Sequence, residues 1–265
     1  MKSTVNGIDI NYELSGAADG PVVVLHHPLA TNLTCWDELT AALEPNYRVL
    51  RLDARGHGKS DAPAGPYAFE TLAKDVVELM TACGVQKASF LGLSMGGMVG
   101  QYLGLLYPER FNCLLLVSTS SRIPDEAQPL WDQRIHAVTT GGMVTQVEGA
   151  IQRWVSPRAI KENPALVERL SQMIKLTPID GYVGWCQAIR GLNVTDRLGA
   201  IRLPTRVIVG EIDPATPVAA SQAIHDAIPG SDLVIVPGFS HMLHNEEPEL
   251  FHSHVLPFLD AHAGK

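Results

Sequence analysis

Short apolar runs alternate with segments of helical periodicity along most of the chain. The apolar runs predict strands over residues 22–25, 47–52, 88–91, 113–117, 205–209 and 233–236. Apolar residues three and four positions apart predict helices over residues 33–43, 69–83 and 248–263. A strand that is apolar throughout is buried on both faces, and helices that alternate with such strands cover a parallel sheet on both sides. The pattern therefore predicts the α/β class, with a mostly parallel, doubly wound sheet.

The segment 8–14 differs from these runs because apolar and polar side chains alternate along it. This alternation is typical of a strand with one face in the core and one face in water. We expect an antiparallel strand at an edge of the sheet, half exposed.

The rhythm of strands and helices stops between residues 121 and 196. This stretch contains three of the four tryptophans and several helical patterns, without a convincing strand. We predict that residues 1–120 and 197–265 form the core, and that residues 121–196 form a helical cap inserted between two strands. Open α/β sheets bind ligands at the carboxyl ends of their strands, so the cap should cover that edge. A helical subdomain without a role in substrate binding is the alternative.

One junction between a strand and a helix carries the strongest chemical signal. Residues 92–96 read Gly-Leu-Ser-Met-Gly, directly after the apolar run 88–91 and before a segment of helical periodicity. A buried strand that ends in Gly-x-Ser-x-Gly and leads into a helix places the serine on a strained turn at the top of the sheet. Glycine is needed on either side because that turn leaves no room for a Cβ atom. The pattern predicts Ser94 as a nucleophile.

A nucleophilic serine needs a base, and the base needs an acid that orients it. Asp213 follows the apolar run 205–209 and is our candidate for the acid; Glu211, which is closer to the strand, is its competitor. His241 follows the last apolar run and is our candidate for the base. The chain order serine, acid, histidine is the one used in sheets of this kind. His244 is expected at the start of a helix as a polar structural residue.

The negative oxygen that forms when a carbonyl is attacked needs N–H donors. Met95 follows the serine and is expected to supply one of them. The loop after the run 22–25 should supply the other. Pro28 in that loop has no N–H, so Leu29 is our candidate for the second donor.

The remaining histidines predict neither a second base nor a metal site. His26 and His27 are adjacent, with no carboxylate or cysteine cluster nearby, so we expect no metal there. His57 lies among glycines and is expected in a tight structural loop after a strand. His252 and His254 would point in different directions on a helix. The sequence has no glycine-rich phosphate-binding loop, and we expect no cofactor.

Composition and charge narrow the class of protein. The chain has 265 residues, of which 46% are apolar, and this suits one domain with a sizeable core. A formal net charge of −8 with no basic run argues against nucleic acid and acidic membranes as partners. Neither a signal-like N-terminus nor an apolar stretch of about eighteen residues occurs, so we expect a cytoplasmic protein without a membrane span. The oligomeric state is not readable from the sequence.

The chain resembles the α/β-hydrolase superfamily over nearly its whole length and, within it, the 3-oxoadipate enol-lactonases. The resemblance rests on residues 28–36, 53–60, 65–67, 92–97 and 215–217. The loop that begins at His26 and His27 departs from the Ser-Asn-Ser-type run of those lactonases. The resemblance implies a Ser-His-Asp hydrolase that acts on a small-molecule ester or lactone without a cofactor.

Two classes of function fit these residues. In the first, Ser94 attacks an acyl carbonyl, His241 takes its proton and Asp213 holds the imidazole, before water releases the acyl group. The resemblance suggests the enol-lactone of aromatic catabolism as substrate. A general carboxylesterase, a carbon–carbon bond hydrolase and a cofactor-free haloperoxidase or perhydrolase share the same triad. In the second class, the same fold is a ligand receptor without turnover.

A dicarboxylic substrate would need a fixed positive charge near the pocket of an acidic protein. We expect this charge from Arg134, one helical turn beyond Trp131, with Arg153 beside Trp154 as the second candidate. Trp131, Arg134 and Trp154 are therefore our candidate substrate-binding residues. Solvent-exposed arginines on cap helices are the alternative.

Overall fold

A central eight-stranded sheet organises the chain, which a computed structural model describes over residues 1–264. The strand order is β1-β2-β4-β3-β5-β6-β7-β8. The strands are β1 Lys2–Val5, β2 Ile8–Gly16, β3 Val22–His26, β4 Arg48–Leu52, β5 Ala88–Leu93, β6 Phe111–Val117, β7 Thr205–Gly210 and β8 Asp232–Val236. The pairs β1–β2 and β2–β4 are antiparallel, and every other neighbouring pair is parallel. The predicted mostly parallel sheet is confirmed.

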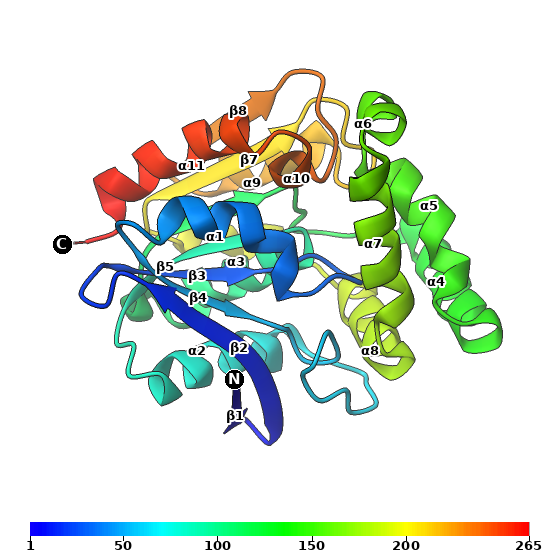
Figure 1. Cartoon of the computed structure of the whole chain (residues 1–265), viewed down its shortest axis with the longest axis horizontal. Helices are drawn as coiled ribbons and strands as arrows, with labels where there is room; N and C mark the ends of the chain where they lie inside the picture. The colour runs from blue at the N-terminus through cyan, green and yellow to red at the C-terminus, as the bar shows by residue number, and fades with distance from the viewer. Residues whose placement is uncertain (265) are drawn as a thin grey trace.

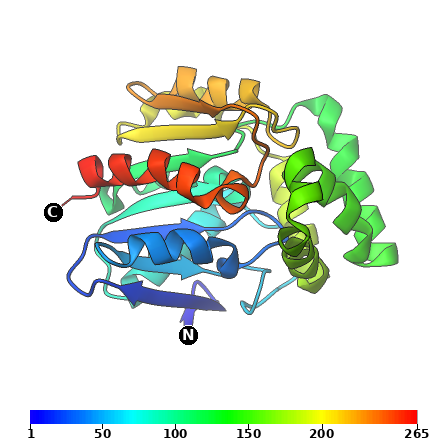
Figure 2. The same cartoon turned by 45° about the horizontal axis from the view of Figure 1, so that its top comes forward.

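Helices cover both faces of this sheet (Figure 1). One face carries α1 (Asp37–Leu43) and α11 (Pro248–His262), and the opposite face carries α2 (Phe69–Ala82), α3 (Met95–Leu106) and α9 (Val218–Ala227). Figure 2 shows the sheet between these two layers. The predicted helix over residues 33–43 begins as a 3₁₀ turn, Leu33–Trp36, before it continues as α1.

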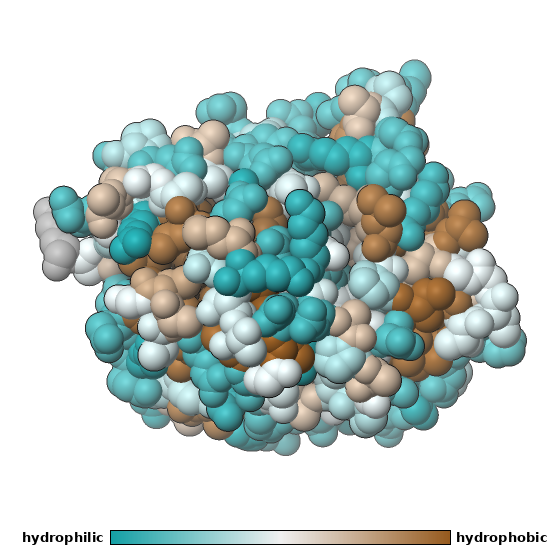
Figure 3. Space-filling view, turned by 60° about the horizontal axis from the view of Figure 1, so that its bottom comes forward, coloured by the Kyte–Doolittle hydropathy of each residue, from teal (hydrophilic) through white to brown (hydrophobic). Residues whose placement is uncertain are grey.

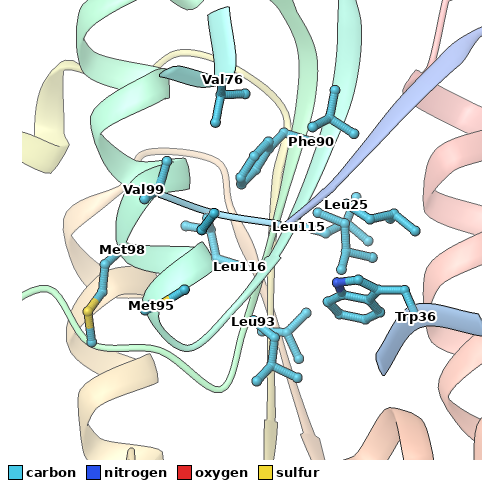
Figure 4. Packing of buried hydrophobic residues seen from close by; sticks show 14 of the residues in the cluster. Leu25, Trp36, Val76, Phe90, Leu93, Met95, Met98, Val99, Leu115 and Leu116 are labelled. Atoms are coloured by element: carbon cyan, nitrogen blue, oxygen red, sulfur yellow. The ribbon is translucent and has the colours of Figure 1, made fainter. Parts of the chain in front are cut away.

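Side chains from β5 and β6 alternate between the two helical layers. Figure 4 shows Phe90 and Leu116 on the side of Val99 of α3, and Leu93 on the side of Trp36. All five of these side chains are buried. Because neighbouring residues of a strand point to opposite faces, a run that is apolar throughout fills both layers of core at once.

The N-terminal edge of the sheet differs from our expectation. β2 is antiparallel, but it is not the edge strand because β1 pairs along it, from Lys2 opposite Asn11 to Val5 opposite Ile8. The two strands form a hairpin around the Asn-Gly pair at residues 6 and 7, where both φ angles are positive. The prediction was wrong because the short, polar β1 lacks a strand-like apolar run. The Asn-Gly pair was the available signal, since it favours tight hairpin turns.

Five helices occupy the stretch between β6 and β7: α4 Gln128–Gly141, α5 Val144–Trp154, α6 Pro157–Glu162, α7 Pro164–Leu176 and α8 Ile179–Arg190. They lie together beyond one end of the sheet, in green at the right of Figure 1. The two chain segments that connect them to the sheet are bonded to each other, with 2.9 Å from Ile123 N to Leu192 O and 2.8 Å from Val194 N to Ser121 O. In the proposals below we treat residues 121–196 as the cap.

The outer surface in the view of Figure 3 is mostly hydrophilic, and its hydrophobic residues form separate patches. None of the helices in the described residues is both long and apolar enough to cross a membrane.

Candidate active site

Ser94 lies on a strained turn between the last residue of β5 and the first residue of α3. Its φ of 56° and ψ of −113° are unfavourable for a residue with a side chain, at a cost of about 1–3 kcal/mol. Two hydrogen bonds hold this turn against the end of β6 and the loop that follows it. The Ser94 N–H donates to the carbonyl of Val117 at 2.9 Å, and the hydroxyl of Thr119 donates to the Ser94 carbonyl at 2.7 Å. The serine is therefore fixed at the carboxyl ends of β5 and β6.

Close backbone packing around the turn explains its two glycines. A Cβ atom on Gly92 would overlap the backbone of Gly96, and a Cβ atom on Gly96 would overlap the carbonyl of His26 at the end of β3. Either substitution would push α3 away from the sheet. The Gly-x-Ser-x-Gly pattern thus corresponds to a packing requirement of this chain.

His241 and Asp213 form a buried hydrogen-bonded pair. Nδ1 of His241 lies 2.8 Å from Oδ2 of Asp213, and the two residues are only 1% and 4% exposed. The other bonds to the carboxylate come from the N–H groups of Ala215 and Thr216, at 2.8 and 3.0 Å, and from the Thr216 hydroxyl, at 2.9 Å. Burial would raise the pKa of Asp213, but the neighbouring His241 and these hydrogen bonds lower it. An ionised Asp213 keeps the proton on Nδ1 and leaves Nε2 of His241 free to act as a base.

The geometry also separates the two candidate acids. Glu211 is exposed, and its carboxylate accepts a bond from Gly238 N at 2.9 Å. It is therefore engaged with the loop after β8 and not with His241. Thr216 was missed as a partner of the acid, although a hydroxyl three residues after an aspartate is a recognisable local hydrogen-bonding pattern.

A cavity of about 420 Å³ lies between the sheet and helices α4, α5, α7 and α8. Six of the eight residues that we predicted at the site line it: Leu29, Ser94, Trp131, Arg134, Trp154 and His241. The other two do not line it. Asp213 bonds to His241, which does, and the Met95 side chain is buried in the core. Met95 is the first residue of α3, so its N–H has no partner within the helix.

Two neighbouring arginines in this cavity, Arg134 and Arg153, have no acidic partner. The guanidinium of Arg134 lies 4.5 Å from the centre of the Trp131 ring, and Arg153 is partly buried next to it. Burial and the charge of Arg134 lower the pKa of Arg153 to about 10, so Arg153 remains charged near pH 7. Within residues 1–264, neither guanidinium forms an ion pair, and none of the cavity-lining side chains is acidic. Arg122 also lines the cavity, and nothing in the sequence pattern indicated it.

The family described as alpha/beta hydrolase fold matches residues 21–248. The chain belongs to this family. It is 36% identical to 3-oxoadipate enol-lactonase 2 of Acinetobacter baylyi over 248 residues, which cover 94% of this chain and 92% of that protein. Among solved structures, it is similar to the enol-lactonase of Burkholderia xenovorans, with a TM-score of 0.95 and 32% identity. The alignment covers 98% of this chain and 100% of that enzyme. It is also similar to the solved structure of a hydrolase from Pseudomonas aeruginosa, with a TM-score of 0.93 and 37% identity. That alignment covers 98% of this chain and 97% of the other.

The loop after β3 in this α/β hydrolase contributes Leu29 to the wall of the cavity that Ser94 lines. The N–H of Ala30 donates to Nε2 of His57 at 2.9 Å, and that of Thr31 donates to the Pro28 carbonyl at 3.3 Å. Pro28 has no N–H. In the described chain, the Leu29 N–H has no partner, which supports Leu29 as the second oxyanion donor.

His57 lies in the loop after β4 and is fully buried, away from Ser94's cavity. His244 lies in α10 (Leu243–Glu246), with its ring centre 4.5 Å from that of Trp36. No group of three or more histidine, cysteine or acidic side chains suited to a metal ion occurs in the part of the chain that the structure describes.

We predict that acid destabilises the fold below about pH 6.5, because four histidines are buried in neutral form. Burial is the main cause that lowers their pKa values, to about 3 or 4 or well below the usual value: His26, His27, His57 and His244. As the pH falls below about 6.5, the unfolded chain binds protons that the folded chain cannot. Above that pH these histidines do not reduce the free energy of unfolding. Below it, each histidine lowers this free energy by up to about 1.4 kcal/mol per pH unit, until its folded-state pKa is reached.

Urea unfolding at about pH 7.5, 6 and 5 measures this loss. Burial raises the pKa of Asp75 and of Glu246, so these two carboxyls act in the opposite sense, but they are fewer than the histidines. An unfolding free energy that stays constant across this range would contradict the neutral state of the buried histidines.

Proposed function

We propose that this α/β hydrolase opens a small lactone or ester through an acyl-enzyme on Ser94. The observation that carries the proposal is the 2.8 Å bond between His241 and Asp213 at the wall of the cavity that Ser94 lines. A base whose orientation is fixed by a buried acid, in the same cavity as a serine on a strained turn, fits the arrangement that activates a hydroxyl group.

In the first half of the reaction, Oγ of Ser94 attacks the carbonyl carbon while Nε2 of His241 takes the hydroxyl proton. The carbonyl oxygen becomes negative and is stabilised by the N–H groups of Leu29 and Met95. When the carbon–oxygen bond of the lactone breaks, His241 returns the proton to the departing oxygen. Asp213 stabilises the positive imidazole between these two transfers.

In the second half of the reaction, His241 takes a proton from water, and the oxygen of the hydroxide that forms attacks the acyl carbon. The bond from that carbon to Oγ of Ser94 then breaks, and Oγ recovers its proton from His241. The product is a carboxylate, and the enzyme returns to its starting state. An enol leaving group, as in an enol-lactone, departs more easily than an alcohol because its oxygen is less basic.

The arginines support a substrate that carries a carboxylate. Arg134 and Arg153 are neighbouring positive charges without acidic partners, so an anion between them would relieve their repulsion and form charge-assisted hydrogen bonds. The enol-lactonase names of the relatives support the same class. We therefore propose 3-oxoadipate enol-lactone, or a lactone of the same charge, as the substrate.

We predict that Ser94→Ala abolishes turnover, since no other side chain can supply the nucleophile. In well-studied serine hydrolases the loss is on the order of 10⁶ in kcat. The measurement is release of p-nitrophenol from a simple ester and opening of the enol-lactone. Ser120→Ala is the matched control because Ser120 lines the same cavity, and it should change kcat only a few-fold. More than a tenth of wild-type activity in Ser94→Ala would overturn the proposed function.

A second pair of variants tests the acid. Asp213→Asn should lower kcat by about 10⁴, because an amide favours the wrong tautomer of His241. Glu211→Gln should change kcat far less, since Glu211 bonds to the loop at Gly238. Steady-state kinetics of both variants on the same ester give the comparison. Equal losses would show that the bond between Asp213 and His241 does not select the acid.

A third set of variants tests the charge of the substrate. Arg134→Gln and Arg153→Gln should each lower kcat/KM for the enol-lactone by roughly tenfold to a hundredfold, since a charge-assisted bond contributes about 1.5–3 kcal/mol. Hydrolysis of a neutral ester should barely change. Arg158→Gln is the control, because Arg158 is exposed and pairs with Glu247 at 2.7 Å outside the cavity. Equal losses on both substrates would mean that the arginines only support the cap.

A further inference from the structure

Two loops at the carboxyl edge of the sheet hold each other through a reciprocal pair of histidines. β3 and β4 are parallel neighbours with His26 opposite Leu52, so the loops that follow them leave the sheet side by side. Nε2 of His27 accepts a bond from Ala54 N at 2.9 Å, and Nε2 of His57 accepts one from Ala30 N at the same distance. Each loop thus supplies one imidazole and one N–H to the other.

The residue that His57 holds is in a strained conformation. Ala30 has a φ of 57°, in the left-handed region, which is unfavourable for a residue with a Cβ atom. A buried hydrogen bond stabilises the folded chain, and a buried N–H without a partner destabilises it by more than the bond contributes. Since Ala30 is only 2% exposed, its N–H has little access to water if the bond to His57 is lost. The bond to His57 therefore helps to keep Ala30 in its strained conformation.

The ring of His57 is itself fixed from the cap. Its Nδ1 lies 3.4 Å from the carbonyl of Arg55, and that carbonyl also accepts a 2.7 Å bond from the indole N–H of Trp185 in α8. The Arg55 guanidinium forms two 2.8 Å bonds to the buried carboxylate of Asp75. With Nδ1 as the donor, Nε2 is left as the acceptor that Ala30 requires.

We propose that His57 positions the oxyanion-binding loop: its bond to Ala30 holds the loop so that the neighbouring Leu29 N–H faces the reacting carbonyl. The proposal rests on the function proposed above. His57 does not line the cavity and touches no reacting atom, so it is a positioning residue. Its loss should weaken binding of the negative oxygen in the transition state and leave binding of the neutral substrate unchanged.

The test compares His57→Gln with His57→Met, two side chains of similar length. Glutamine keeps an oxygen that can accept the Ala30 N–H, whereas methionine offers only a weak acceptor. Removal of an oxyanion donor costs about 10²–10³ in kcat, and a displaced donor should cost less. For a p-nitrophenyl ester we expect His57→Met to lower kcat by about tenfold to a hundredfold at nearly constant KM. His57→Gln should recover most of this loss.

A boronic acid provides a second readout, because its tetrahedral adduct with Ser94 carries an oxygen where the oxyanion forms. The inhibition constant of phenylboronic acid should rise in His57→Met by the same factor as kcat falls. His252→Met is the matched control: His252 is buried on α11, and its Nε2 has no hydrogen-bond partner in the described chain. It should leave kcat and the inhibition constant unchanged.

Other outcomes separate this inference from the proposed function. Unchanged kcat in His57→Met, together with an inactive Ser94→Ala, would overturn only the role of His57. Equal losses in the Gln and Met variants would also overturn it, because the acceptor would then not matter. If His57→Met does not fold, Trp185→Phe removes the indole donor but keeps a ring. It should lower kcat at constant KM, and unchanged kcat would again overturn the inference.

Discussion

The approach of Gly96 to the carbonyl of His26 is the contact on which the site depends. It brings the start of α3 against the end of β3, so Ser94 emerges at the edge where the central parallel strands end. Three residues with side chains adopt positive φ angles at this edge: Ala30, Ser94 and Ser118, after β3, β5 and β6. Strained backbone persists only where the surrounding structure holds it, and two of these three residues, Ala30 and Ser94, line the cavity.

The charge of the whole chain and the charge of the cavity have opposite signs. A net charge of −8 repels anions at a distance, but salt screens that field over about 10 Å. Arg134 and Arg153 act within a few ångströms, in a partly buried site where screening is weaker. For an anion inside the cavity, attraction by this pair therefore exceeds repulsion by the distant negative charges. The composition of the chain could not predict the positive charge of the cavity, because that charge depends on which arginines face inward.

Helix α8 contacts the core at the loop that follows β4. Gly181 of α8 packs so closely on Gly56 that a Cβ atom on either residue would overlap the other's backbone. Trp185, one helical turn further on, donates its indole N–H to the Arg55 carbonyl. The position of α8 is thus set by backbone contact with the loop after β4. Through His57, the same loop contacts the segment that contains Leu29.

The sequence alone determined the layered α/β fold and predicted Ser94 as the nucleophile, because runs that fill two core layers and glycines that avoid backbone overlap are local requirements. It misjudged the edge of the sheet, since the four-residue β1 is ordered only by pairing with β2. Contacts between distant segments were left to the tertiary structure. The bond from His57 to Ala30 spans 27 residues, and whether Arg153 faces a cavity or water depends on how the helices pack. No pattern along the chain specifies such contacts, because they arise only when separate elements meet.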